Sequence, residues 1–299
     1  MSILVVGSVA LDDVETPHGS VKNSLGGSAL YFGAAAGIFT PVNLVGVVGE
    51  DFDLNTIEFL KSRGVDFRGL TVEPGETFRW GGRYHDNINK RDTLYTYLNV
   101  FENFKPAIPE HYRRDPLVFL ANIDPELQLQ VLEQMERPRL TLLDTMNFWI
   151  HGKKQPLLEL IPRIDVLILN DEELQELTDI PHLYRAAESL LQMGPQAVVV
   201  KKGEHGAVLI DREGYFIAPA YPVEKVVDPT GAGDSFAGGF LGYLATCTQI
   251  EDIAFRKAIV FGSVVASFTV EDFSFNRLKT ITRDDLDQRL ERVRGMTRF

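Results

Sequence analysis

Short runs of apolar residues recur along the chain, and segments with helical spacing of apolar residues separate them. The runs are rich in Val, Ile and Leu without regular alternation with polar residues, which is the pattern of strands covered on both faces. We therefore expect buried strands joined by helices over most of the chain. The expected strands are residues 3–6, 43–48, 117–121, 140–143, 166–169 and 197–201.

The segments between these runs predict helices. Residues 29–39 are rich in Ala, and residues 54–63 carry apolar residues at helical spacing. Asp124 is a candidate N-cap for a helix over 125–134. Because strands alternate with helices, the sequence predicts an α/β fold with a mostly parallel central sheet covered on both faces. Further helices are expected over 172–177, 184–193 and 234–245, and after Thr282.

One segment departs from this alternation. Residues 77–84 and 93–100 are rich in Thr, Tyr, Phe and Trp, and the polar stretch 85–92 lies between them. This pattern predicts a β-hairpin outside the main sheet. Such a hairpin could cover a pocket, form a dimer contact or be a surface ornament, and composition alone leaves the three alternatives open.

The composition excludes several classes of function. The chain has 42 acidic and 30 basic residues among 299, a formal charge of −12 that repels nucleic acid and anionic membrane surfaces. Cys247 is the single cysteine, so we expect neither an intrachain disulfide nor a cysteine-based metal cluster, but a small buried side chain. No basic leader and no apolar run of about 20 residues is present, which predicts a cytoplasmic protein.

Residues 226–240, with the sequence VVDPTGAGDSFAGGF, carry the most informative motif. A strand, a glycine turn and a helix in this order would direct backbone N–H groups and the helix dipole at one anion. Asp234, at the expected helix start, could accept a proton from a hydroxyl that attacks a phosphoryl group. The alternative is an ordinary N-cap in a tight turn, but the length of the string favours a functional role. The glycine–lysine pair of a P-loop is missing.

This string resembles the C-terminal signature of the ribokinase-like (PfkB) carbohydrate kinase family, which includes ribokinase, fructokinases and adenosine kinases. The resemblance implies an ATP-dependent kinase with a ribokinase-like three-layer α/β/α fold and a small β lid. It implies that Asp234 is the general base and that the amides of Gly231, Ala232 and Gly233 form an anion hole. Asp228 and Thr230 would lie near the phosphates, and in some members the position of Asp228 helps to bind a monovalent cation such as K⁺.

The N-terminal part is similar to the same family where the acceptor binds. Asp12, with Asp13 as second choice, matches an aspartate that holds sugar hydroxyls, as a carboxylate can. Gly26 and Gly27 match a glycine pair at which the backbone approaches the acceptor. Many members have Asn four residues after the second glycine, but this chain has Tyr31, which weakens a transfer of ribokinase's substrate. We expect Tyr31 in the core.

Two further motifs resemble the nucleotide side of the family's site. Asn170 and Glu173 match an N-x-x-E motif that organises Mg²⁺, largely through waters, near the ATP phosphates. Lys201, Gly203 and Gly206 match a K-x-G-x-x-G turn that approaches the nucleotide. Taken alone, an acidic helix start and a hairpin turn would explain these two stretches as well.

Two asparagines follow expected strands, at the edge where open α/β sheets bind ligands. We expect Asn122 and Asn147 at the substrate cleft. By resemblance, the chain is a single domain over 1–299, and its lid is formed by about 12–25 and 76–100. Arg79, Tyr84 and Asn99 are unranked candidates for substrate contact.

These observations predict transfer of the γ-phosphate of ATP, with Mg²⁺, to an alcohol group of a small sugar. A nucleoside acceptor is the first alternative, with Tyr31, Trp80 and Phe101 as candidates for stacking on a base. A non-catalytic sugar-binding regulator is a lower alternative, because a fold does not dictate activity. A dinucleotide-dependent oxidoreductase is disfavoured, because no glycine fingerprint follows the first strand. The expected partner is a small molecule, and the resemblance suggests a homodimer through the lid.

Overall fold

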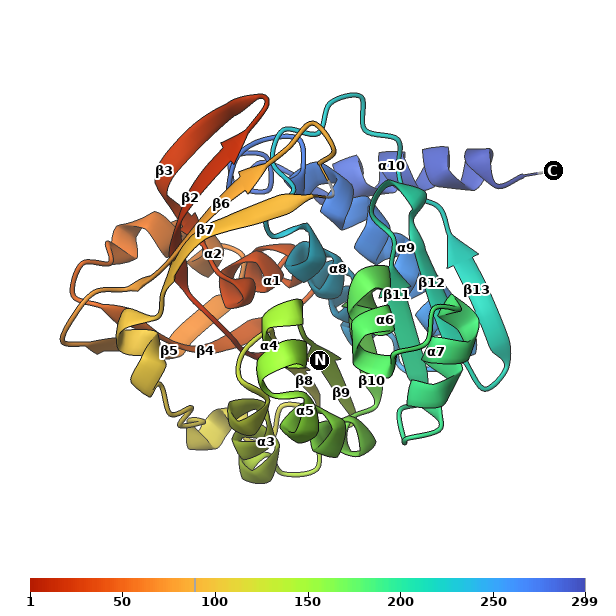
Figure 1. Ribbon diagram of the computed structural model, residues 1–299, viewed down its shortest axis with the longest axis horizontal. Coiled ribbons are helices and arrows are strands. Elements are labelled where there is room, and N and C mark those ends of the chain that lie inside the picture. The colour runs from red at the N-terminus through yellow and green to blue at the C-terminus, as the bar shows by residue number, and fades with distance from the viewer. Residues whose placement is uncertain (89, 299) are drawn as a thin grey trace.

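The computed structural model describes residues 1–88 and 90–298. Nine strands form one sheet in the order β13-β12-β11-β10-β9-β8-β1-β4-β5 (Figure 1). The ladders from β11 through β5 are parallel, and β12 and β13 add two antiparallel strands at one edge. The predicted α/β fold with a mostly parallel sheet is confirmed. The strands are β1 (Ile3–Val6), β4 (Val42–Gly49), β5 (Val65–Glu73), β8 (Leu117–Leu120), β9 (Leu140–Asp144), β10 (Val166–Asn170), β11 (Ala197–Lys201), β12 (Ala207–Asp211) and β13 (Gly214–Ala218).

Helices cover both faces of this sheet, which gives three layers. Alternate residues of β1 show why its sequence is apolar throughout: Ile3 and Val5 belong to one core, and Leu4 and Val6 belong to the other. Residues of α1, α8, α9 and α10 pack in the first core, and residues of α3, α5, α6 and α7 pack in the second. The helices are α1 (Ser28–Ala36), α2 (Glu58–Lys61), α3 (Pro125–Gln134), α4 (Asn147–Gly152), α5 (Lys154–Leu160), α6 (Asp171–Thr178), α7 (Leu183–Leu191), α8 (Ala232–Thr246), α9 (Asp252–Thr269) and α10 (Arg283–Met296).

Helix α3 has the predicted bounds, and the Asp124 side chain accepts a hydrogen bond from the Glu126 N–H as its N-cap. Two other helices are shorter than expected. Helix α1 ends at Ala36 instead of residue 39, because the chain turns at Gly37. The helix expected over 54–63 divides into a 3₁₀ segment, Leu54–Ile57, and the single turn α2.

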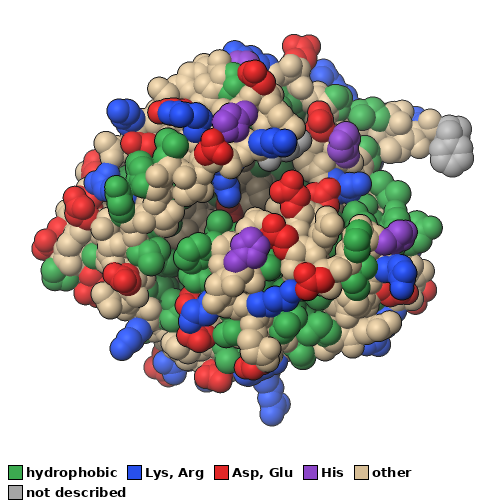
Figure 2. Space-filling model, in the orientation of Figure 1, with side chains coloured by type: hydrophobic (Ala, Val, Ile, Leu, Met, Phe, Trp, Pro, Cys, Tyr) green, Lys and Arg blue, Asp and Glu red, His purple; other side chains and the backbone are tan. Residues whose placement is uncertain are grey.

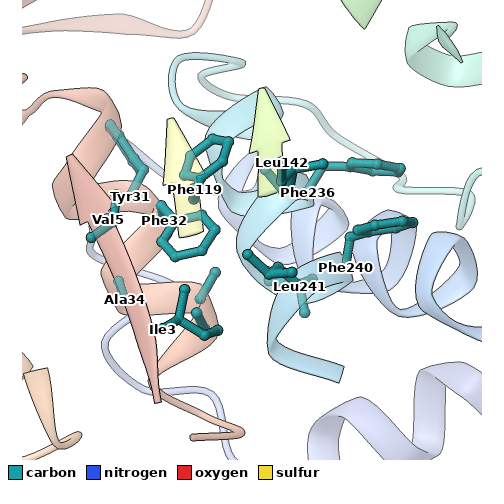
Figure 3. Packing of buried hydrophobic residues seen from close by; sticks show 14 of the residues in the cluster. Ile3, Val5, Tyr31, Phe32, Ala34, Phe119, Leu142, Phe236, Phe240 and Leu241 are labelled. Carbon is teal, nitrogen blue, oxygen red and sulfur yellow. The ribbon is translucent and has the colours of Figure 1, made fainter. Parts of the chain in front are cut away.

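Close packing joins α1 and α8 to the sheet. The rings of Phe32 on α1 and Phe119 on β8 stack with centroids 4.3 Å apart, and Figure 3 shows them next to Leu142 and Leu241. Where α8 crosses α1, a Cβ on Gly238 would lie 2.6 Å from the Cβ of Ala35. This crossing therefore requires glycine, which holds the start of α8 in a fixed place relative to the sheet.

A second, four-stranded sheet lies outside the main one, in the order β3-β2-β6-β7, and we call it the lid (Figure 1). The predicted hairpin is present as β6 and β7, but its second strand ends at Tyr97 instead of residue 100. The chain turns there because Asn99–Asn103 forms a 3₁₀ helix. The lid strands are β2 (Ala10–Thr16), β3 (Gly19–Gly26), β6 (Phe78–Tyr84) and β7 (Arg91–Tyr97).

Register within the lid decides which side chains share a face. Asp12 on β2 pairs with Trp80 on β6, and Tyr84 pairs with Arg91 on β7. Trp80 and Tyr84 are four positions apart on one strand, so all four side chains lie on one face of the lid. Within the described residues, no helix has both the length and the apolar character needed to cross a membrane.

Candidate active site

The motif at 226–240 forms a turn followed by α8. We call residues 228–233 the glycine turn. The strand expected before it is absent: the N–H groups of Val227 and Asp228 donate to the carbonyl of Val270 at 2.7 and 3.3 Å, so the end of α9 holds this segment. Helix α8 begins at Ala232, after Gly231 at φ 75°, so Asp234 is its third residue rather than its first.

Tyr31 lies under the glycine turn. Its side chain is buried in the core, as expected, and its ring stacks on Phe275 with centroids 4.3 Å apart. A Cβ on Gly231 would lie 2.4 Å from the Tyr31 ring, so only glycine allows the turn to rest on this ring. The amides of the turn are not equivalent. Ala232 N–H donates to the Pro229 carbonyl at 3.2 Å, whereas Gly231 and Gly233 N–H have no protein acceptor among the described residues.

Asp234 lies in an acidic environment. Burial and the negative charge of Asp144 together raise the pKa of its carboxyl group to about 7, against the opposing positive charge of Lys201. A carboxyl group with a pKa in this range can exchange a proton near neutral pH. The position on the first turn of α8 also places it where the helix dipole is positive.

The carboxyl group of Asp12 lies close enough to Asp234 to interact with it electrostatically. Burial, together with the negative charges of Asp228 and Asp234, raises the pKa of Asp12 well above its usual value. The side chain is 4% exposed, and no N–H or O–H group of the described residues donates a hydrogen bond to its carboxylate. A Cβ on Gly26 would lie 1.9 Å from the Asp12 Oδ2, so Gly26 makes room for the carboxylate. Asp13, the second choice, instead accepts from the Asn23 N–H at 2.7 Å.

Asp228 and Thr230 connect the glycine turn to its surroundings. The Asp228 carboxylate accepts from the Thr230 N–H at 2.9 Å and from the Ser274 N–H at 3.4 Å. The Thr230 hydroxyl donates to the Tyr84 hydroxyl at 3.2 Å, which joins the turn to the lid. Gly27, at φ 98°, packs against the backbone of Ser8, where β1 leads into the lid.

Lys201 ends β11 and forms a buried ion pair with Asp144 at the end of β9, with Nζ and Oδ1 3.1 Å apart. A Cβ on Gly233 would lie 3.0 Å from this Nζ, so the ammonium group lies beside the glycine turn. The buried amide of Gln128 donates to the carbonyls of Ala121 and Asp144 and fixes the ends of β8 and β9. The sequence prediction missed Asp144 as a site residue, although its place at a strand end was a usable signal.

Asn170 and Glu173 form a capping box at the start of α6. The Asn170 side chain accepts from the Glu173 N–H at 2.8 Å, and the Glu173 carboxylate accepts from the Asn170 N–H at 2.7 Å. The N-x-x-E spacing thus has a structural explanation. Burial nevertheless raises the pKa of Glu173 to about 7, against the positive charge of Lys201, because the side chain lies inside the same group of charges.

This group fits a hydrated Mg²⁺ better than a direct metal site. No set of three or more His, Cys, Asp or Glu side chains in the described part of the chain is arranged to hold a metal ion. The carboxyl groups of Asp144, Glu173 and Asp234 outnumber the ammonium group of Lys201, and hard carboxylate oxygens suit a cation that keeps its waters.

The other predicted residues lie in varied surroundings. Gly203 starts the turn Gly203–His205 between β11 and β12, and Gly206, at φ 89°, passes close to the Ala218 carbonyl. Asn122 has a buried Oδ1 without a partner among the described residues, whereas the Asn147 amide donates to Glu176 at 2.6 Å.

Among the three unranked lid candidates, two form structural contacts where the lid joins the body. Arg79 pairs with Asp51 at 2.7 Å, and the Asn99 amide donates to the Thr77 carbonyl at 2.9 Å. Tyr84, the third, faces the glycine turn. Figure 2 shows a hollow in the middle of the face between the lid and helices α4 and α6, with acidic and basic side chains on its rim.

Comparison with known proteins decides the family. The sequence profile described as pfkB family carbohydrate kinase matches residues 2–280. The chain belongs to this family. The PfkB chain is 30% identical over 251 residues to the cytidine kinase of Thermococcus kodakarensis, which covers 81% of this chain and 88% of that protein. It is 26% identical to the nucleoside kinase of Methanocaldococcus jannaschii, which covers 90% of each chain.

Solved structures agree on the fold. The nucleoside kinase of Burkholderia thailandensis in complex with inosine matches with a TM-score of 0.80 at 20% identity, over 98% of this chain and 99% of that chain. The structure of the M. jannaschii nucleoside kinase, described as an archaeal member of the ribokinase family, matches with a TM-score of 0.77 at 24% identity, over 97% and 98%. The PfkB chain is thus an ATP-dependent kinase of a sugar or nucleoside with a ribokinase-like fold.

Proposed function

We propose that this PfkB kinase transfers the γ-phosphoryl group of ATP to a hydroxyl of a nucleoside, with Asp234 as the general base. One observation carries the proposal: the nearly buried, unpartnered Asp12 carboxylate lies within electrostatic reach of Asp234 at the glycine turn. Asp12 offers acceptor oxygens for substrate hydroxyls, and Asp234 offers a base near them. A non-catalytic regulator would need only the first of these groups.

The geometry supports an in-line transfer. Asp12, beside Gly26 and Gly27, would hold the acceptor's hydroxyls, and Asn122 would offer its unpaired oxygen. The attacking oxygen forms a bond to the γ-phosphorus, the bond to the bridging oxygen breaks, ADP leaves, and Asp234 receives the hydroxyl proton. The free N–H groups of Gly231 and Gly233, with Lys201 beside them, would stabilise charge on the transferring group.

The nucleotide would lie on the other side of the glycine turn. Thr230, Lys201, Gly203 and Gly206 would border its phosphates. Mg²⁺ bound through waters to Asn170 and Glu173 would neutralise phosphate charge. We expect K⁺, if it binds, beside Asp228, although two N–H groups already engage that carboxylate. The amide of Asn147 would donate to the acceptor only after its hydrogen bond to Glu176 breaks.

An aromatic side chain on the lid face that carries Asp12 favours a nucleoside acceptor over a free sugar. Trp80 pairs in register with Asp12, so a flat indole ring lies one strand away from the carboxylate that would hold ribose hydroxyls. A base attached to that ribose could stack on the ring. The similar proteins named above include a cytidine kinase and two nucleoside kinases, which agrees with this choice.

Acceptor-dependent release of ADP tests the proposal. The purified protein is incubated with Mg·ATP and a panel of cytidine, adenosine, inosine, ribose and fructose, and phosphorylated products are identified by mass spectrometry. We expect turnover with at least one nucleoside and a kcat/KM far below it for the free sugars. Phosphorylation of a free sugar with no nucleoside turnover would contradict the nucleoside assignment. ADP release independent of every acceptor would contradict transfer altogether.

We also propose a homodimer through the lid. Leu94 and Tyr97 on β7 are 44% and 56% exposed, which is unusual for large apolar side chains on a strand at the edge of a sheet. Sedimentation velocity of the wild type should give twice the mass of one chain, and Tyr97→Glu should give the mass of one. A wild-type monomer at all concentrations would contradict the proposal.

A further inference from the structure

The lid carries one pair of facing side chains that has no assigned role in the phosphoryl transfer proposed above. Tyr84 and Arg91 lie directly opposite each other in the β6–β7 ladder, on the lid face that also carries Asp12 and Trp80. Opposite residues of an antiparallel pair have neighbouring side chains, so the phenol and the guanidinium group form one unit.

Tyr84 links this pair of side chains to the glycine turn through a hydrogen bond. The ring is 8% exposed, and its hydroxyl accepts from Thr230, the residue directly before Gly231. Burial raises the pKa of Tyr84, and the positive charge of Arg91 opposes this effect, which shows that the guanidinium group lies near the phenol. The Arg91 side chain is therefore held above the start of α8.

Arg91 differs from the other arginines of the lid. The guanidinium groups of Arg79 and Arg83 pair with Asp51 at 2.7 Å and with Glu15 at 2.6 Å. Among the described residues no carboxylate forms an ion pair with Arg91, which is exposed and lies 5.2 Å from the centre of the Trp80 ring. The Trp80 ring and the neighbouring Tyr84 phenol orient the guanidinium group, whose five N–H donors outnumber these contacts.

The charge of Arg91 acts across the cleft. It opposes the rise in the pKa of Glu173, which lies on α6 in the body of the molecule and not on the lid. Lys201 acts on both Glu173 and Asp234, and Arg91 adds a second positive charge near Glu173 that is carried by the lid. An incoming triphosphate adds further negative charge at the same place, and a planar guanidinium group matches phosphate oxygens in pairs.

We propose that Arg91 is a catalytic residue that binds the phosphoryl group in transfer, and that Tyr84 positions it over the glycine turn. Arg91 keeps its protons throughout. The bond that forms joins the acceptor oxygen to phosphorus, the bond that breaks frees ADP, and the guanidinium group stabilises the charge on the equatorial oxygens. Because the cation is carried by the lid, closure over the acceptor would complete the transfer site.

The first test compares Arg91→Met with Arg83→Met, a matched loss of an arginine from the same hairpin whose partner is Glu15. Removal of one donor to transition-state charge typically lowers kcat by about 10²- to 10³-fold, and we expect this for Arg91→Met with the KM for ATP unchanged. Arg83→Met should keep the wild-type kcat. Arg91→Lys should recover part of the rate, since it restores charge without the planar fork.

The outcomes separate this proposal from the kinase activity on which it rests. Wild-type turnover in the same assay establishes the activity, and calorimetric titration with Mg·ADP shows whether the variant's nucleotide site is intact. Arg91→Met with wild-type kcat would overturn the proposal. A change confined to the KM of the acceptor would assign Arg91 to acceptor binding and would also overturn it.

A double-mutant cycle tests the role of Tyr84. Loss of one hydrogen bond in Tyr84→Phe should lower kcat by about 5-fold, because the bond contributes about 1 kcal/mol. If Tyr84 acts through Arg91, Tyr84→Phe should have no further effect on kcat in the Arg91→Met background. Multiplicative effects of the two substitutions would show that Tyr84 acts independently, which contradicts a positioning role.

Discussion

Asp234 combines a buried carboxyl group with a position on the first turn of a helix. Burial raises the pKa of this group, whereas the helix position lowers it. Burial and Asp144 disfavour its charged form, whereas Lys201 and the helix dipole favour it. The balance leaves its pKa at about 7, which is the range in which a base can accept a proton and release it again.

Asp234→Asn removes the base and keeps the shape of the side chain. We expect kcat to fall by about 10²- to 10⁴-fold, which is the usual contribution of a general base, with little change in the affinity for Mg·ATP. A coupled ADP assay and calorimetric titration measure the two quantities. Near-normal turnover would contradict the assignment.

The raised pKa of Asp234 also predicts the pH dependence of the reaction. The base works in its deprotonated form, so log kcat/KM should rise with pH and level off above about 7, because this ratio reports the free enzyme. A pH profile measured with saturating Mg²⁺ checks this. A rate that stays constant from pH 5 to pH 8 would show that Asp234 does not titrate in this range.

At the residue scale, Asp12 and Asp234 were predicted from the motifs around them that resemble those of the family, because a lone aspartate is equally typical of a turn or an N-cap. The negative charge of Asp234 acts on Asp12 in the structure. Arg91 and, despite its place at a strand end, Asp144 were not predicted, because their roles depend on neighbouring side chains in the folded chain. Asp144 matters through its ion pair with Lys201, and Arg91 through the face of the lid on which it lies.

Among the elements, α6 shows how one motif serves structure and charge together. Its capping box satisfies two backbone N–H groups at the helix start, and the same Glu173 places a buried carboxyl group, with its pKa raised to about 7, near Lys201 and Asp144.

Glu173→Gln separates the two roles, because the amide oxygen can still accept from the Asn170 N–H. We expect unchanged stability but a higher Mg²⁺ concentration for half-maximal rate. Asn170→Ala is the matched control: it should lower the free energy of unfolding by about 1 kcal/mol through loss of the cap. Urea denaturation and Mg²⁺ titration measure both. Equal stability losses with unchanged Mg²⁺ dependence would leave Glu173 a capping residue alone.

The buried strands were predictable because their apolar runs reflect two cores, as the alternate side chains of β1 show. The strand expected before the glycine turn was wrong for a physical reason. Val226 and Val227 have strand-like side chains, but the N–H of Val227 bonds to the carbonyl of Val270, a long-range contact that propensity does not contain. The 3₁₀ segment Leu54–Ile57 was missed because its apolar spacing is also that of an α-helix.

On the scale of the whole molecule, the attachment of the lid to the body depends on Asp51. Its carboxylate accepts from the N–H and hydroxyl of the fully buried Thr77, at 2.7 and 2.6 Å, and pairs with Arg79. These partners lower the pKa of Asp51 despite the opposing effect of burial.

Asp51→Ala should lower the free energy of unfolding by about 1–3 kcal/mol, because it leaves a buried N–H group unpaired, and it should raise the KM of the acceptor. The pKa of Asp51 is lowered in the folded state, so its charge stabilises the fold above the unfolded pKa. The loss of unfolding free energy in the variant should therefore shrink as pH falls through the folded pKa.

Glu15→Ala, the control, breaks an exposed ion pair and should lower the free energy of unfolding by about 0–1 kcal/mol. Equal losses in both variants would show that Asp51 does not anchor the lid.

Asp12 and Asp234 come from opposite ends of the chain, and the site exists only where β2 and the start of α8 come together. A fragment that ends before residue 228 keeps all nine strands of the main sheet, but it lacks Asp234 and the helices α8, α9 and α10, which supply a large part of one core. Turnover therefore requires the C-terminal helices to be docked on the sheet.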